Sequence, residues 1–193
     1  MSRLPGPHVP ELSTVAELGR RRPGSADRHV PPEHTSRRIP CTKGGTKIMS
    51  PSTEETIVTI MRENASPAYL ATCDGDQPRV RPVTPIVEDD MSVWVATFCT
   101  SRKVRQIKKN PNICLAFVEL PRGDKAATLL GRCEIVNDMK QKKRVWSLAT
   151  FDLSQHFPQG PEMEEYCVLR IIIDKIEWRE SWTSKLEVYE PAQ

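Results

Sequence analysis

The hydrophobic and polar positions of the chain from residue 52 onward follow two periods, one typical of helices and one typical of strands. Helical spacing predicts helices over residues 52–64, 101–109 and 139–150. Alternating or continuously apolar runs predict strands over residues 67–73, 78–87, 92–98, 112–119, 126–136, 165–178 and 185–190. Strands therefore outnumber helices in the predicted domain.

Short local motifs define the boundaries of several of these elements. Ser52 and Glu55 form a Ser-x-x-Glu capping box at the start of the first helix. Asp74 and Gly75 form an Asp-Gly pair between the first two strands, which is a strong hairpin signal. Most neighbouring strands are joined by segments too short for a parallel crossover. We therefore predict a mainly β domain, an antiparallel barrel with flanking helices.

The composition divides the chain into two parts. Residues 1–48 contain no Phe, Trp or Tyr and seven of the seventeen prolines, so they cannot bury enough apolar surface to offset their ordering entropy. We expect a disordered N-terminal arm over residues 1–48 and one folded domain over residues 49–193. The folded part holds 19 Lys and Arg against 21 Asp and Glu, which does not favour a nucleic-acid-binding domain.

Other residue types exclude several classes of site and location. The six cysteines lie fifteen or more positions apart, so no zinc-binding spacing occurs, and we predict no metal site. His156 is the only histidine of residues 49–193 and accompanies no nucleophile motif, so we interpret it as a loop residue. Free cysteines indicate a reducing compartment, and no apolar run has the length of a membrane span. We expect a cytoplasmic protein.

The helix predicted after residue 100 begins with an unusual charge pattern. Thr100 or Ser101 can cap the helix, and Arg102 and Lys103 follow in its first turn. Free backbone N–H groups and the helix dipole make this end electropositive, so two cations there are unfavourable unless an anion binds between them. This pattern indicates a phosphate site, although a solvated charged helix face would show the same pattern.

The strand predicted over residues 78–87 adds a second group of cations. Arg79 and Arg81 are two positions apart and so lie on one face of the strand, where two guanidiniums suit a phosphate. Pro82 and Pro85 cannot donate to a strand ladder, so this strand is an edge, is irregular, or is opened beside another group. Together with the helix start, it predicts a phosphate site with room for a planar group.

These segments resemble a known family. The stretches QPRVRPVTPI (77–86), VWVATF (93–98), TSRKVRQIKKNPNICLAF (100–117) and YCVLRIIIDKIEW (166–178) are similar to the pyridoxamine 5'-phosphate oxidase-like FMN-binding split barrels of the general stress protein type. The resemblance covers about residues 52–182. It implies an antiparallel split barrel that forms a homodimer, with FMN in the groove between the subunits.

The resemblance also implies which residues contact the cofactor. Arg81, Arg102 and Lys103 correspond to the residues that hold the FMN phosphate, and Ser101 adds a donor. The backbone of residues 82–86 would run along the isoalloxazine ring, with Ala96 and Thr97 opposite. Arg79 is added from the strand geometry alone. The expected cofactor-binding residues are Arg79, Arg81, Pro82, Val83, Thr84, Pro85, Ile86, Ala96, Thr97, Ser101, Arg102 and Lys103.

The chain departs from the vitamin B6 oxidases at two places. Ile86 stands where those enzymes carry a lysine, and the segment RESWTSKLEVYE (179–190) has no histidine for the pyridoxal phosphate substrate. Oxidation of pyridoxamine phosphate is therefore not expected. Three functions remain open: an FMN-dependent oxidoreductase with an unassigned substrate and a small-molecule or nicotinamide donor, a non-enzymatic flavin-binding stress-response module, and a barrel that binds another anion or nucleic acid. Related barrels also hold haem or a deazaflavin in place of FMN. The sequence does not identify a catalytic residue.

Overall fold

A computed structural model of the chain describes residues 51–191, and the predicted N-terminal arm (1–48) lies outside the described residues. Within the described part, an antiparallel sheet is flanked by helices. The helices are α1 (Thr53–Glu63), α2 (Arg102–Lys109) and α3 (Met139–Leu148), with two short 3-10 turns, η1 (Leu153–Gln155) and η2 (Gly160–Glu162). The strands are β1 (Ala68–Asp74), β2 (Gln77–Val83), β3 (Pro85–Val87), β4 (Val93–Phe98), β5 (Asn112–Val118), β6 (Ala126–Val136), β7 (Tyr166–Arg179) and β8 (Glu187–Tyr189).

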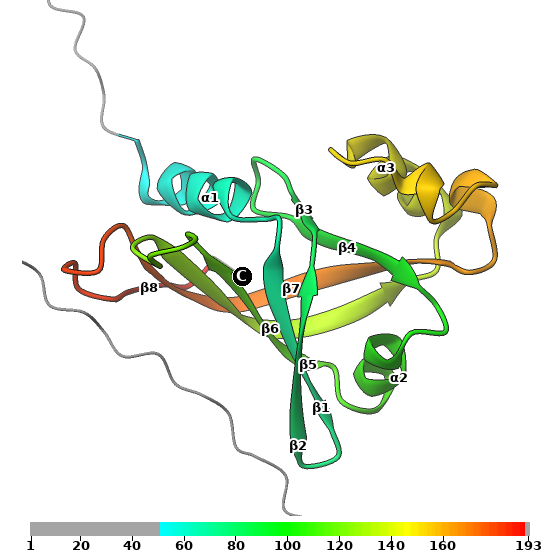
Figure 1. Ribbon diagram of the computed structural model, residues 1–193, viewed down its shortest axis with the longest axis horizontal. Helices are drawn as coiled ribbons and strands as arrows, with labels where there is room; N and C mark the ends of the chain where they lie inside the picture. Colours follow the sequence, from blue (N-terminus) through cyan, green and yellow to red (C-terminus); the bar gives the residue numbers. More distant parts are fainter. Residues whose placement is uncertain (1–50, 192–193) are drawn as a thin grey trace, which may run out of the picture. The chain divides into compact units, whose positions relative to one another are not determined.

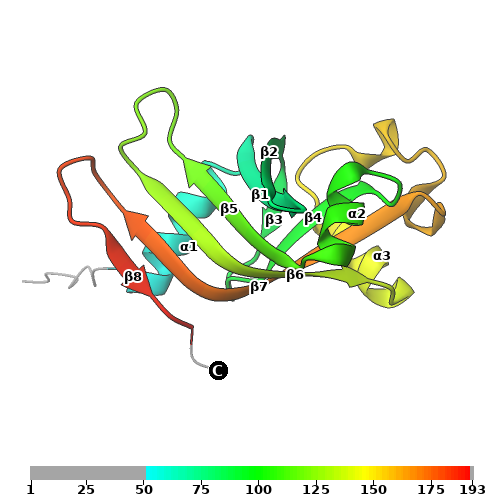
Figure 2. The same ribbon diagram turned by 90° about the horizontal axis from the view of Figure 1, so that it is seen from below.

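The strands pair in the order β2-β1-β5-β6-β7-β4-β3, and β8 pairs with β7. The first and last strands of this order, β2 and β3, follow each other in the chain and are separated by Thr84. The sheet curls so that its two ends approach through this link, as Figures 1 and 2 show, with α1 at one end of the sheet and α2 and α3 at the other. The predicted antiparallel split barrel with flanking helices is confirmed.

One predicted strand is divided. The sequence predicts a single strand over residues 78–87, but the structure has β2 and β3 on either side of Thr84, at opposite ends of the sheet. Pro82 and Pro85 provide the reason, because neither can donate a ladder hydrogen bond and Pro85 stands at the first position of β3. The chain therefore changes its strand partner, from β1 to β4, between two residues that have no backbone N–H donor.

The predicted local signals describe the corresponding turns correctly. Ser52 Oγ accepts a hydrogen bond from the Glu55 backbone N–H at 3.2 Å, and the Glu55 carboxylate accepts one from the Ser52 N–H at 2.8 Å. Asp74 pairs with Gln77 across a two-residue turn, where Gly75 has a φ of 61°, a conformation that favours glycine. These contacts involve residues at most four apart, which explains why sequence alone predicts them.

The apolar side chains form two clusters on opposite sides of the sheet. The larger cluster fills the barrel and includes Val93 and Val95 of β4. The smaller one contains Trp94 and packs Val145 of α3 and Phe157 against the other face of the same strand. Because successive residues of a strand point to opposite faces, β4 is buried on both sides. This double burial holds β4 in place between the two clusters.

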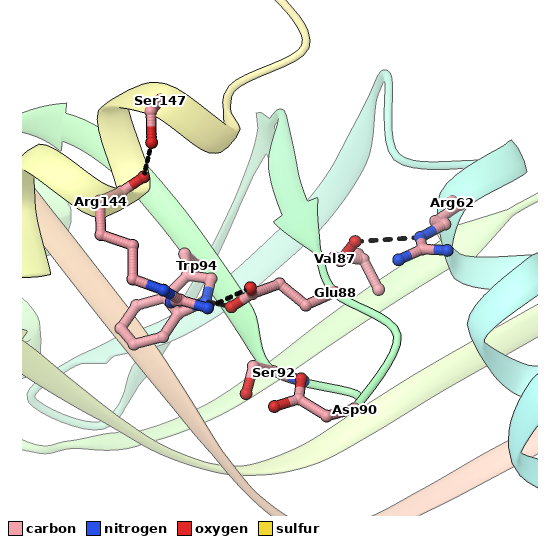
Figure 3. A network of polar contacts seen from close by, with 8 residues as sticks. All are labelled: Arg62, Val87, Glu88, Asp90, Ser92, Trp94, Arg144 and Ser147. Carbon is pink, nitrogen blue, oxygen red and sulfur yellow. Dashed lines mark hydrogen bonds and ion pairs between the residues drawn. The ribbon is translucent and has the colours of Figure 1, made fainter.

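The turn between β3 and β4 is tied to two helices by the polar network of Figure 3. The Trp94 indole N–H donates to Glu88 Oε1 at 2.7 Å, and the other Glu88 oxygen pairs with Arg144 of α3. On the other side, Arg62 Nε of α1 donates to the Val87 carbonyl at 3.0 Å. The hairpin that carries part of the candidate site is therefore anchored from both directions.

Candidate functional site

The start of α2 has the charge pattern that the sequence predicts. Ser101 is the N-cap residue by backbone conformation, but its hydroxyl makes no capping hydrogen bond. The first turn carries Arg102 and Lys103 and no acidic residue. Ser101 Oγ is buried without a hydrogen-bond partner among the described residues. A buried hydroxyl without a partner is costly, and an anion at this helix end would supply an acceptor.

Four cations surround a cavity in front of this helix start, which we call the phosphate cavity. It has a volume of about 380 Å³ and contains no carboxylate in its lining. It brings together cations from strand β2 and from helix α2, which lie more than twenty positions apart in the chain. The lining residues are Arg79, Val80, Arg81, Ser101, Arg102, Lys103 and Gln106.

The cations of the phosphate cavity destabilise one another's charged forms. Burial, followed by the nearby charges of Arg102 and Arg79, lowers the pKa of Arg81 below its ordinary value. Burial, followed by the charge of Arg81, lowers the pKa of Lys103. Burial is the larger cause of both lowered pKa values and the neighbouring cations are the smaller one, and an anionic ligand in the cavity would offset the repulsion between the cations. Perturbed groups gathered in a cavity are typical of a functional site.

Gln106 is a central residue of this site that sequence reasoning missed. Its side chain is 6% exposed. Gln106 Oε1 accepts hydrogen bonds from Thr72 Oγ1 at 2.7 Å and from Arg81 NH2 at 2.9 Å, and its Nε2 donates to Asp74 at 3.2 Å. Arg81 NH1 also donates to the Leu70 carbonyl at 3.0 Å. Both terminal nitrogens of the Arg81 guanidinium thus donate to the protein, which orients the remaining N–H groups.

A second cavity, which we call the aromatic cavity, begins at the other side of Lys103. Lys103 Nζ donates to Thr97 Oγ1 at 2.7 Å, and Thr97 lines the aromatic cavity. This cavity has a volume of about 220 Å³. Its lining residues are Thr84, Ala96, Thr97, Phe98, Phe151, Leu153, His156 and Phe157. A single hydrogen bond therefore connects a cationic cavity to an apolar one.

The predicted cofactor-binding residues are divided between the two cavities and the core. Thr84, Ala96 and Thr97 line the aromatic cavity, whereas the side chains of the other four residues of the stretch 82–86 line neither cavity. Pro85 and Ile86 are buried, and Ile86 belongs to the smaller apolar cluster. Contact of Pro85 and Ile86 with a ligand would therefore involve their backbone.

The aromatic lining was not predicted from the sequence. His156 directly follows η1, as expected of a loop residue, yet it borders the aromatic cavity with Phe98. Phe98 is 58 positions before His156 in the chain, so no local pattern connects them. The only available signal was the occurrence of Phe151, His156 and Phe157 within seven residues.

We expect the anion affinity of the phosphate cavity to fall as the pH rises through the lowered pKa of Lys103. The folded protein loses this proton at a lower pH than the unfolded chain, so between the two pKa values the lysine is neutral only when folded. Sulfate, which keeps its charge over this range, should then raise the melting temperature less at alkaline pH than at neutral pH, measured against sodium chloride of equal ionic strength.

The matched control for this experiment is Lys103→Arg, because an arginine at this position stays charged over the whole range. Its stabilisation by sulfate should be nearly independent of pH. An equal decline in both proteins would show that Lys103 does not contribute to anion binding.

Two further properties concern metal ions and membranes. Within residues 51–191, no group of three or more His, Cys, Asp or Glu side chains could hold a metal ion. None of the helices in this part of the chain combines the length and the apolar character that a membrane-spanning helix needs.

A family model and several solved structures match the chain. The family model described as pyridoxamine 5'-phosphate oxidase matches residues 54–179, more than half of the chain. General stress protein 26 of Bacillus anthracis is similar in structure, with a TM-score of 0.55 and 22% identity over 71% of this chain and 98% of that one. A protein of Clostridium acetobutylicum related to general stress protein 26, of the pyridoxinephosphate oxidase family, has a TM-score of 0.59 and 21% identity over 72% and 96%.

A third similar structure is described as a heme binding protein from Mycobacterium smegmatis. It has a TM-score of 0.59 and 14% identity, and the match covers 74% of this chain and 60% of that one. At these identities the similarity shows a shared fold only. No curated protein sequence matches the chain.

Proposed function

The chain belongs to the pyridoxamine 5'-phosphate oxidase family, and from this premise we propose that residues 49–193 bind FMN and act as a flavin-dependent oxidoreductase. The phosphate cavity is the observation that carries the proposal. It combines four cations, no carboxylate in its lining and a buried hydroxyl without a partner among residues 51–191. A phosphate monoester supplies the negative charge and the hydrogen-bond acceptors that these groups lack.

The residues around the phosphate cavity have distinct roles in this proposal. Arg81, held by Gln106, directs its free N–H groups toward the phosphate, and Arg102 and Lys103 neutralise the second charge. Ser101 Oγ gains an acceptor. The isoalloxazine ring lies across the opening of the aromatic cavity, along Thr84, Ala96 and Thr97. When bound there, FMN supplies the electron transfer, and the protein supplies orientation and electrostatics.

We further propose that two copies of the chain form a homodimer with the flavin at their interface. An exposed apolar side chain borders the phosphate cavity, where Val80 is 66% exposed. A partner subunit would cover such surface. Sedimentation of the purified protein at several concentrations measures this assembly, and a monomer at all of them would contradict it.

Vitamin B6 oxidation is not part of the proposal. Ile86 replaces the lysine of those oxidases, and its side chain is packed in the smaller apolar cluster. The segment after β7 contains Trp182 and no histidine, so the substrate contacts of those enzymes have no counterpart there. We therefore propose a substrate other than pyridoxamine phosphate.

The first test of the proposal is the absorption spectrum of the purified protein, with mass spectrometry of the small molecule released on denaturation. We expect flavin bands and the mass of FMN. Turnover of reduced nicotinamide by the FMN-loaded protein then separates an oxidoreductase from a non-enzymatic flavin module. A colourless protein that does not bind added FMN would contradict the proposal.

Haem is the second candidate ligand, because His156 lies at an apolar cavity where an iron ligand could act. The structural similarity to a heme binding protein points in the same direction. The two ligands have different visible spectra, so the same measurement decides between them. The four cations are gathered at one helix start, which suits the compact dianionic phosphate of FMN, whereas haem carries its two negative charges on separate propionate groups.

A further inference from the structure

The aromatic cavity contains side chains for which FMN binding gives no role. We propose that Phe98, Phe151 and His156 form a substrate subsite for a small, uncharged, planar carbonyl compound of the quinone type, with His156 donating a hydrogen bond to its oxygen. This inference rests on the proposed function, because the subsite adjoins the region assigned to the flavin ring.

The Phe98 ring packs against Phe157 and is otherwise partly exposed to solvent. The Phe157 ring packs against it with a centroid distance of 4.7 Å and an interplanar angle of 42°, and Phe157 itself is only 2% exposed. Phe98 remains 40% exposed. An aromatic ring held from one side and open on the other is suited to stacking with a planar ligand.

The backbone that carries His156 is held at the edge of the Phe98 surface. Its ring centroid lies 6.5 Å from that of Phe98, at an interplanar angle of 78°. Its backbone N–H donates to the Leu153 carbonyl at 3.0 Å. The preceding turn is stabilised by Asp152, which accepts hydrogen bonds from the Ser154 backbone N–H at 2.9 Å and from its hydroxyl at 2.6 Å.

The lining chemistry limits the class of substrate. His156 is the only titratable side chain among the eight lining residues, and the other polar groups are the hydroxyls of Thr84 and Thr97. The cations are gathered in the phosphate cavity instead. A strongly charged ligand would therefore find no counter-charge in the aromatic cavity, whereas a carbonyl oxygen needs only one donor.

The size of the aromatic cavity sets a further limit. Its volume of about 220 Å³ is below the range of roughly 300–1,000 Å³ that is typical of sites for drug-sized ligands. The aromatic rings of Phe98 and Phe151 in the lining favour a planar molecule that can stack on them over a branched one. A small quinone fulfils each condition: planarity, zero charge and an oxygen at its edge.

The test uses the full chain saturated with FMN and titrated with menadione, with the change in flavin fluorescence as the measure of binding. We expect Phe98→Ala to weaken menadione binding about tenfold through loss of stacking. His156→Leu should weaken it by up to about tenfold through loss of the donor, whereas His156→Gln, which keeps a donor, should restore most of the affinity. Phe98→Leu serves if Phe98→Ala does not fold.

Two controls make the result specific. Gln159→Leu changes an exposed residue near His156 that does not line the cavity, and it should bind menadione like the wild type. 1,4-Cyclohexanedione carries two similar oxygens without an aromatic plane and should bind at least about tenfold more weakly than menadione.

The outcomes separate this inference from the proposed function. A wild-type protein that does not bind FMN contradicts the proposed function and removes the premise of the subsite. A protein that binds FMN but not menadione, or whose menadione affinity is the same in the Phe98 and His156 variants, overturns the subsite and leaves FMN binding intact.

Discussion

Replacing Arg81 and Lys103 together by alanine is expected to abolish FMN retention while the barrel stays folded. Each substitution removes a charge-assisted hydrogen bond to the phosphate, worth about 1.5–3 kcal/mol. Because 1.4 kcal/mol corresponds to a factor of ten, the dissociation constant should rise by roughly 100- to 10,000-fold. The affinity is measured by fluorescence titration with FMN, and the fold by circular dichroism.

The fold should survive this double substitution because the ligand-free site is electrostatically unfavourable. Burial and mutual repulsion lower the pKa values of both groups, so their removal relieves repulsion in the absence of the phosphate. Proteins commonly trade stability for function at such sites. Loss of the folded state in the double variant would show that these residues have a structural role.

The matched control is the double variant Arg105→Ala, Lys109→Ala. It removes the same net charge, one residue of each kind, from exposed positions of α2 that do not line the phosphate cavity. We expect its FMN affinity to fall by less than about threefold, since exposed charges act through a screened field. Equal losses in the two double variants would contradict a specific phosphate site.

Gly131→Ala is expected to destabilise the barrel more than any exposed substitution in the same strands. Gly131 lies at a register shift between β6 and β7, where it pairs with Ile173 while Leu130 pairs with Lys175. A Cβ atom at this position would lie 2.0 Å from the Ile172 carbonyl oxygen, which belongs to the backbone and cannot rotate away. The two longest strands of the sheet would have to separate locally.

The expected loss is about 3 kcal/mol in the free energy of unfolding, the upper end of the usual cost of overpacking. Urea denaturation measures this loss. We expect the unfolding midpoint to shift to a lower urea concentration and the variant to be folded in the absence of urea. The control is Arg132→Ala at the next position, whose exposed pair with Asp174 spans 3.8 Å and should cost less than about 1 kcal/mol. A wild-type midpoint for Gly131→Ala would show that the bulge adapts without strain.

Much of the fold could be predicted because it follows from contacts between near neighbours in the chain. The capping box of Ser52 and Glu55, the turn at Gly75 and the start of α2 at Ser101 each involve residues a few positions apart. Strand periodicity and short connections then favour antiparallel pairing. The break at Thr84 was missed because β2 and β3 differ in their partners, β1 and β4, rather than in their composition.

The candidate site was likewise predictable where its residues lie close together in the chain, and not where they lie far apart. The sequence identified the cations of the phosphate cavity from their own positions, since two arginines two apart share a strand face and two cations at a helix start need an anion. It did not identify Gln106, whose partners Thr72, Asp74 and Arg81 are 25 to 34 positions away. A glutamine that becomes buried cannot be recognised from the sequence of a helix whose other polar residues are all Lys or Arg.

By itself the sequence determined the antiparallel barrel, its flanking helices and the presence of unbalanced positive charge at the start of α2. Only the tertiary structure decided that Phe98 and His156 share a cavity, and that Lys103 connects this cavity to the phosphate cavity through Thr97. The physical reason is that helical and strand preferences act over a few residues. The curling of a sheet brings together side chains whose separation in the chain carries no such signal.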